Sequence, residues 1–216
     1  MSLYTPRHFG VDDRAAAARM IDDFPFATLV TPTAGEPAIS HLPLLWDPHD
    51  ETRGVLLGHC ARANPHWQLA RNVASVAVFH GPHAYVSPSW YAEPAKAVPT
   101  WNYATVHAHG TLEAIDDPAA TRGVLDTLVA RFEGSRAAPW TLAMPARERD
   151  AMIGAIVAFR IRVHRLDAKF KLSQNRSAVD RAGVVAGLEA ETHAESHATA
   201  AWMRADARDS GGDAKS

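Results

Sequence analysis

Residues 156 to 166 alternate apolar and polar side chains more regularly than any other stretch of this chain. One face of an extended strand would carry Val157, Phe159, Ile161 and Val163, and the other would carry Arg160, Arg162 and His164. Such alternation is typical of a strand in an antiparallel sheet that has one face in the core and the other in solvent. This stretch therefore constrains the chain to a fold with an antiparallel sheet.

The rest of the sequence predicts several more strands and a set of helices. Apolar runs bounded by turn residues predict strands over 26–31, 38–46, 54–60, 75–80, 84–89 and 100–115. Helical spacing and capping signals predict helices over 11–24, after Asn64-Pro65, over 118–134 and 145–154, and from Ser177. We therefore expect a mainly β fold with helices (α+β), in which a closed antiparallel barrel carries peripheral helices.

The chain shows no internal repeat and no clear linker over its 216 residues. We therefore predict one domain over residues 1–191. From residue 192 the sequence is rich in Ala, His, Asp and Ser and ends in SGGDAKS. That composition predicts a fraying helix followed by a disordered C-terminal tail over 192–216.

Composition and charge argue against several function classes. The formal net charge is −2, which gives no general attraction to nucleic acid or to anionic membranes, so direct DNA binding is disfavoured. No apolar run reaches the roughly 20 residues that cross a bilayer. The first ten residues lack the features of a signal peptide, and Cys60 is the only cysteine. These features favour a cytoplasmic protein without disulfides.

Residues 82 to 110 contain the densest set of aromatic and polar side chains. Two clusters, 87–91 and 98–103, flank a polar loop that contains Pro94. Buried Tyr and Trp usually need a partner for their polar atoms, and Pro is poorly tolerated in a central strand. A hairpin would bring the clusters together as a flat aromatic surface edged with hydrogen-bond donors, which suits a planar, polar ligand. The alternative is a hairpin whose aromatic side chains fill one end of the barrel.

With two further motifs, this stretch resembles the PaiB family, described as FMN-binding negative transcriptional regulators. The motifs are Arg62-Ala63-Asn64-Pro65 and the segment from Lys169 to Arg176, and the resemblance runs from Tyr4 to about Leu188. It implies the FMN-binding split barrel that is shared with pyridoxamine-phosphate oxidases. It also implies a homodimer with two flavin sites at its interface.

The resemblance and the chemistry of FMN together predict three groups of binding residues. The phosphate needs cations or N–H groups, which Arg62, the helix start at Asn64 and Lys171 could supply. Polar side chains after the clearest strand would lie at the rim of the site: Ser173, Gln174 and Asn175. The isoalloxazine ring would be edged by Ser87, Ser89, Trp90, Thr100, Trp101 and Asn102. The alternative for Arg62 and Lys171 is an ordinary solvated surface charge.

No metal site is expected, although the chain contains twelve histidines. His107 and His109 would share one face of a strand, but no acidic residue accompanies them at ligand spacing. Cys60 has no nearby cysteine or obvious base and is expected to be buried and inert. The predicted function is a regulator that senses flavin or redox state. The alternative is a flavin-dependent oxidoreductase with Tyr91, Tyr103 or His107 as proton donor, and the sequence leaves enzymatic activity undecided.

Overall fold

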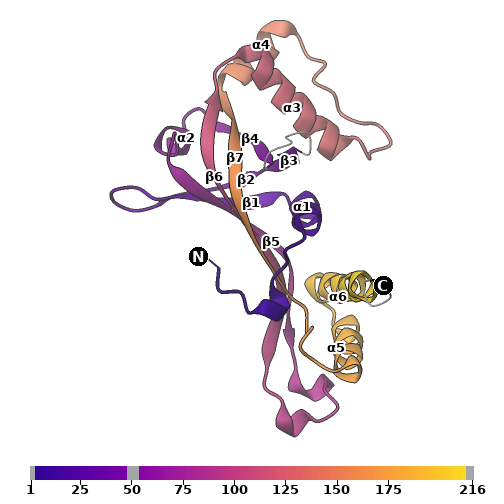
Figure 1. Ribbon diagram of the computed structural model, residues 1–216. Coiled ribbons are helices and arrows are strands. Elements are labelled where there is room, and N and C mark those ends of the chain that lie inside the picture. The colour runs from indigo at the N-terminus through magenta and orange to yellow at the C-terminus, as the bar shows by residue number, and fades with distance from the viewer. Residues whose placement is uncertain (1–2, 48–53, 213–216) are drawn as a thin grey trace. The chain divides into compact units, whose positions relative to one another are not determined.

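The computed structural model describes residues 3–47 and 54–212 and contains one seven-stranded sheet with helices (Figure 1). The strand order is β2-β1-β5-β6-β7-β4-β3, and the registers of β1 with β2 and β5, and of β4 with β3 and β7, are antiparallel. The strands are β1 (Phe26–Thr31), β2 (Ala38–Pro43), β3 (Leu45–Asp47), β4 (Val55–Ala61), β5 (Ala74–Val86), β6 (Thr100–Ile115) and β7 (Ile156–Lys171).

The described residues also form six α-helices and three short 3-10 helices. The α-helices are α1 (Arg14–Asp23), α2 (His66–Leu69), α3 (Pro118–Glu133), α4 (Ala146–Gly154), α5 (Ala178–Ala190) and α6 (Ala194–Gly212). The 3-10 helices are η1 (Arg7–Phe9), η2 (Pro88–Trp90) and η3 (Pro94–Lys96). In the part of the chain that the structure describes, no helix is both long and apolar enough to cross a membrane.

The residues fall into two compact units. The barrel unit comprises Ala18–Phe79 and His107–Leu166, and the hairpin unit comprises Met1–Ala17, His80–Val106 and Asp167–Ser216. Strands β5, β6 and β7 each run through both units, so neither unit is a continuous segment. The prediction of one domain over residues 1–191 stays a prediction.

The barrel unit closes because of its connections. Strands β2 and β3 lie at opposite ends of the strand order, yet only Leu44 joins them, and β2 also contacts β4. The two ends of the sheet must therefore meet. Leu44 is fully buried in this closure. The interior is filled by large side chains that are less than 2 % exposed: Leu29, Leu44, Leu56, Phe79, Leu112, Phe159 and Ile161.

Alternation in β7 explains why this strand forms as the sequence predicts. Val157, Phe159, Ile161 and Val163 are buried, whereas Arg160 and Arg162 are exposed and both donate to Glu113 on β6. On the outward face of the barrel, Val124 and Leu128 of α3 pack in a small cluster with Leu45 and Ala158. The predicted antiparallel barrel with peripheral helices is confirmed.

The hairpin unit is built from strand ends and the two C-terminal helices. The N-terminal segment lies along β7, where Gly10 bridges Lys169 and the Val11 N–H donates to the Ala168 carbonyl at 3.2 Å. Helices α5 and α6 pack side by side (Figure 1). Leu172, Leu188 and Met203 are almost completely buried in this unit.

The structure corrects the prediction of a fraying helix followed by a disordered tail over 192–216, because the helix extends through most of this segment. Residues 194–212 form α6, and Ser196, Thr199, Ala200 and Met203 are buried. These positions follow the i, i+3, i+4, i+7 spacing of one helix face, so packing fixes a segment whose average composition suggests disorder. Residues 213–216 lie outside the described residues.

Candidate functional site

Lys171, the last residue of β7, is bonded to the start of β6 within the hairpin unit. Its Nζ donates to the Thr100 hydroxyl at 2.7 Å and to the Trp101 carbonyl at 2.5 Å. Burial lowers the pKa of Lys171, and the positive charges of Lys169 and Arg176 lower it further. Lys169 lies two residues earlier on β7 and Arg176 follows in the turn after it, so three cations occur close together in the chain.

Among the residues that the structure describes, no carboxylate pairs with any of the three cations Lys169, Lys171 and Arg176. Lys169 is only 7 % exposed, and its Nζ donates to the Tyr4 carbonyl at 2.9 Å. The same Nζ lies 5.5 Å from the ring centroid of Tyr4 and 5.2 Å from that of Tyr103. Aromatic faces stabilise a cation but do not neutralise it. We call Lys169, Lys171 and Arg176 the cation cluster.

Arg176 of the cation cluster lies over the ring of a buried tyrosine whose hydroxyl has no hydrogen-bond partner among the described residues. The Arg176 guanidinium lies 4.7 Å from the ring centroid of Tyr91. Tyr91 is 6 % exposed, and its hydroxyl forms no hydrogen bond within the described part of the chain. A buried polar atom without a partner is costly, so a ligand atom or a water molecule is expected beside it.

The turn after β7 is fixed by the side chains that the sequence assigns to the rim of the site. Ser173 has a left-handed backbone (φ 65°), and its hydroxyl is bonded to the side-chain amide of Asn102 at 3.0 Å. The Gln174 side chain accepts from the Leu172 N–H and donates to the Phe170 carbonyl. These three side chains therefore shape the turn from within, whereas Asn175 is exposed.

Ser87, Ser89 and Trp90 form the other side of the hairpin. The Ser87 hydroxyl accepts from the Ser89 N–H and caps η2, and the two hydroxyls are 2.8 Å apart. Trp90 packs against α5, since a Cβ added at Gly187 would lie 2.3 Å from its indole. Helix α5 therefore covers part of the indole predicted to edge a ring.

Exposed aromatic side chains lie next to the cation cluster. Trp101 is 54 % exposed, its ring centroid is 6.2 Å from that of Tyr85, and the His83 ring lies at 6.4 Å. We call His83, Tyr85 and Trp101 the aromatic platform. Because Lys171 binds the Trp101 carbonyl, the platform and the cation cluster adjoin.

Arg62 and Asn64 lie in the barrel unit, and the other ten predicted site residues lie in the hairpin unit. Arg62 donates from Nε to the Gly154 carbonyl at 2.7 Å and from Nη2 to the Ile156 carbonyl at 2.8 Å. Asn64 donates to the Ser40 hydroxyl and accepts from the His66 N–H. Helix α2 has only four residues, so it provides little dipole for binding a phosphate.

The structure adds Lys169 and Arg176 to the predicted binding residues, and it places Tyr91, a candidate proton donor in the sequence, beside Arg176. Lys169 lies two residues before Lys171 and hence on the same face of β7, a signal that the sequence already contained. Between Leu3 and Asp47, and between Gly54 and Asp206, no three His, Cys, Asp or Glu side chains are placed to hold a metal ion. Cys60 is buried as a free thiol, and burial raises its pKa.

Comparisons with known proteins identify the family of the chain. Residues 3–165 match a family described as "Putative FMN-binding domain". The chain is 34% identical to "Protease synthase and sporulation protein PAI 2" of Bacillus subtilis over 192 residues, which cover 88% of this chain and 90% of that protein. The resemblance found in the sequence is thereby confirmed.

Two solved structures share the fold at low sequence identity. The structure of the FAD and heme binding protein from Mycobacterium smegmatis matches with a TM-score of 0.60 and 19% identity, over 80% of this chain and 78% of that chain. The flavocytochrome Anf3 from Azotobacter vinelandii also matches with a TM-score of 0.60, at 14% identity over 77% and 72%.

Proposed function

Because the chain belongs to the family described as "Putative FMN-binding domain", we propose that it binds FMN in the hairpin unit. The observation that carries this proposal is the cation cluster, which has no acidic partner in the described part of the chain and adjoins the aromatic platform. An FMN phosphate would supply the missing negative charge. A flat aromatic side chain suits the isoalloxazine ring.

The residues present fit the chemical requirements of FMN. Lys171 and Arg176 would hold the phosphate, and the buried Lys169 would add positive charge nearby. Trp101 and the Ser87–Trp90 segment would face the ring, while Thr100 and Asn102 and the 173–175 turn would meet the ribityl chain and the rim. When bound, FMN supplies one- and two-electron transfer. The protein's contribution is to fix the cofactor and set its electrostatic surroundings. Arg62 and Asn64 as ligands of FMN stay predictions.

The experiment that tests this proposal compares FMN with riboflavin, which lacks the phosphate. Isothermal titration calorimetry on Lys171→Ala should show FMN affinity reduced roughly ten- to a hundredfold, since a charge-assisted contact contributes about 1.5–3 kcal/mol. Riboflavin affinity should stay unchanged, whereas Trp101→Ala should weaken both ligands. Lys96→Ala is the matched control, because Lys96 lies on the same hairpin but pairs with Glu93. If wild-type protein takes up no FMN, the proposal fails.

For the biological role, we propose a regulator that senses flavin or redox state, as the PaiB resemblance implies. The net charge of −2 favours a mechanism that does not depend on direct DNA binding. The cytoplasm remains the expected compartment, on the sequence argument alone. A regulator of this kind should change its oligomeric state or stability between oxidised and reduced FMN, which sedimentation and thermal melting would measure.

A flavin-dependent oxidoreductase is the second candidate, and Tyr91 favours it. Its ring lies against Arg176 of the cation cluster, and its buried hydroxyl, without a partner in the described residues, would be available to donate a proton to a ligand. Enzymatic turnover would appear as oxidation of NADH or NADPH by the FMN-loaded protein, lost in Tyr91→Phe. Equal oxidation by free FMN would argue for the regulator instead.

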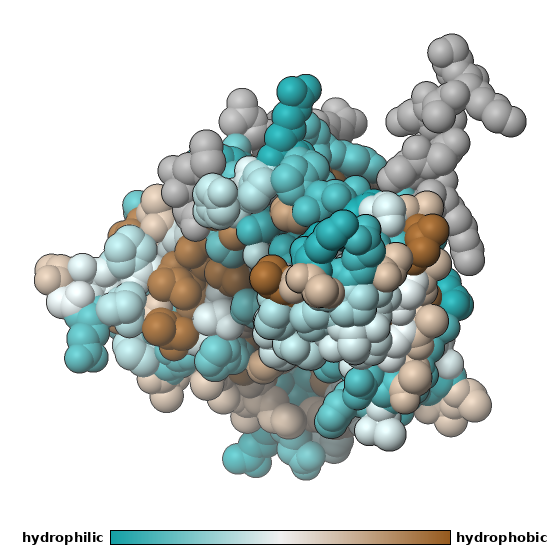
Figure 2. Space-filling model, turned by 90° about the horizontal axis from the view of Figure 1, so that it is seen from below, coloured by the Kyte–Doolittle hydropathy of each residue, from teal (hydrophilic) through white to brown (hydrophobic). Residues whose placement is uncertain are grey.

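We also propose a homodimer. Apolar side chains are exposed in the hairpin unit, among them Val98 at 67 % and Val179 at 69 %. In the view of Figure 2, brown hydrophobic residues form patches among teal hydrophilic ones. A twofold interface would cover such patches. Sedimentation equilibrium should give twice the mass of one chain at micromolar concentration, and a monomer with and without FMN would contradict this.

A further inference from the structure

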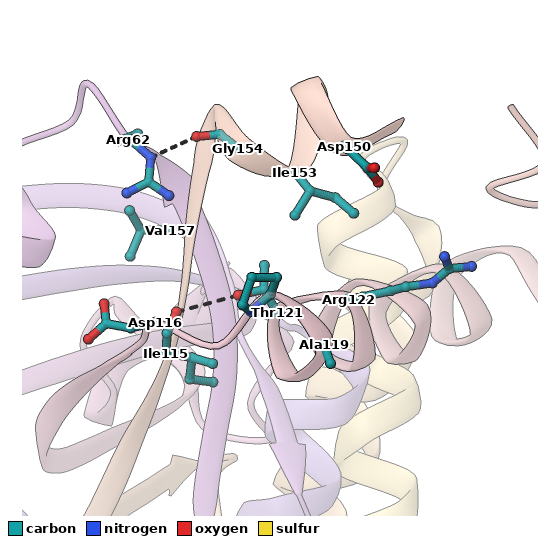
Figure 3. A pocket seen from close by; sticks show the side chains of 11 residues that line it. Arg62, Ile115, Asp116, Ala119, Thr121, Arg122, Asp150, Ile153, Gly154 and Val157 are labelled. Carbon is teal, nitrogen blue, oxygen red and sulfur yellow. Dashed lines mark hydrogen bonds between the residues drawn. The ribbon is translucent and has the colours of Figure 1, made fainter. Parts of the chain in front are cut away.

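The barrel unit contains a pocket of about 530 Å³ that the proposed FMN site does not use. It lies where the end of β6 meets the first turn of α3, the end of α4 and the start of β7 (Figure 3). Ile115, Ile153 and Val157 give it an apolar wall. Its volume falls within the range of about 300–1,000 Å³ that is usual for small-molecule sites.

Arg62 lines this pocket in a fixed orientation. Its bonds to the Gly154 and Ile156 carbonyls engage two of the five guanidinium N–H groups, and Figure 3 shows the guanidinium turned toward Val157. Within residues 3–47 and 54–206, no carboxylate pairs with it. A guanidinium held in place by backbone carbonyls keeps its remaining donors ready for a planar anion.

The other charged side chains of the pocket are already neutralised. Each has a salt-bridge partner of opposite sign outside the pocket: Asp116 pairs with Arg71 at 3.3 Å, Arg122 with Asp126 at 3.6 Å, and Asp150 with Arg149 at 3.4 Å. Arg62 therefore leaves the pocket with one uncompensated positive charge beside an apolar wall.

We infer that this pocket binds a small amphipathic anion, namely a monocarboxylate with an apolar chain or ring. One net positive charge matches a carboxylate, whereas a phosphate dianion would leave a negative charge uncompensated. The two-pronged geometry of a carboxylate also fits a planar guanidinium. This gives Arg62 a ligand other than the FMN phosphate that the sequence predicts for it, and the experiment below decides between the two. The inference stands on the barrel unit alone, so it does not depend on FMN binding in the hairpin unit.

The test uses octanoate as the probe, with octan-1-ol as its uncharged counterpart. Calorimetry on the full chain should show that Arg62→Gln lowers octanoate affinity at least tenfold and leaves octanol affinity unchanged. Arg122→Gln removes the same charge from the same pocket but from a paired side chain, so it should change octanoate affinity less than twofold. Ile153→Trp fills the pocket while keeping Arg62, and it should abolish octanoate binding without changing FMN affinity.

Two results would overturn the inference. The first is octanoate binding that is absent in wild type or equal in Arg62→Gln. The second is a loss of FMN affinity in Arg62→Gln with riboflavin affinity unchanged, which would return Arg62 to the FMN phosphate. Since Arg62 also braces Gly154 and Ile156, Arg62→Lys and the melting curve of each variant serve as controls. If an Arg62 variant has a lowered melting temperature, the result with Ile153→Trp decides instead, because it tests the same pocket.

Discussion

Two glycines in helices allow a controlled test of how closely α5 packs on the hairpin. A Cβ added at Gly183 would lie 2.2 Å from the backbone carbonyl oxygen of Trp90. A backbone atom cannot rotate away, so Gly183→Ala must push α5 and η2 apart. In contrast, a Cβ at Gly123 on α3 meets no atom within 4 Å. The two substitutions are chemically identical and differ only in their surroundings.

The expected stability changes follow from two opposing terms. Alanine is better than glycine in a helix interior by about 1 kcal/mol, and both variants gain this amount. Overpacking costs about 1–3 kcal/mol, and only Gly183→Ala carries that cost. Gly123→Ala should therefore raise the free energy of unfolding by about 1 kcal/mol. Gly183→Ala should change it by between roughly 0 and −2 kcal/mol.

Thermal unfolding followed by circular dichroism measures this difference. For a chain of this length, 1 kcal/mol corresponds to about 2–4 °C in Tm. We expect Gly123→Ala to melt a few degrees above wild type and Gly183→Ala to melt at or below it. If Gly183→Ala gains as much stability as Gly123→Ala, the close approach of α5 to Trp90 is wrong, and so is the argument that α5 covers the indole.

Two further predictions concern His66 and α6. Burial lowers the pKa of His66, whose ring nitrogens bond to the Ser40 and Thr31 hydroxyls, so the unfolded chain binds a proton first as pH falls. Its contribution to stability should be complete above about pH 6.5 and decrease below it, and urea unfolding of His66→Gln should show a flatter pH profile. Deleting residues 194–216 should lower Tm by several degrees, because Ala200 and Met203 are buried; an unchanged Tm would restore the prediction of a disordered tail.

Local pattern predicted most of the barrel but missed one continuous strand. Gly81-Pro82 suggested a break between two strands, yet β5 runs from Ala74 to Val86. The reason is register: β1 pairs with β5 only from Val76 to Phe79, so Pro82 lies beyond the paired stretch and needs no donor toward β1. Single-sequence patterns do not give register, and hence the length of β5 could not be predicted.

In the candidate site, too, the sequence predicted features within short segments but not contacts between distant ones. The hairpin and the Lys171 turn were identified from sequence, because their motifs lie within short segments. The sequence did not predict that Asn102 and Ser173 bond to each other, since 71 residues separate them. Nor did it show that two carbonyls already hold Arg62, because they lie at the end of α4 and the start of β7, more than 90 residues away along the chain.

Charge placement is the strongest reason to expect a ligand at the cation cluster. The chain contains 24 acidic and 22 basic side chains, so acidic residues are available to neutralise every cation. Elsewhere the structure uses them, as where Glu113 accepts from both Arg160 and Arg162. Lys169 is buried with no acidic partner in residues 3–47 and 54–206, and burying a charge without a partner of opposite sign costs stability. An anionic ligand would offset that cost, and an acidic side chain placed there would exclude the ligand.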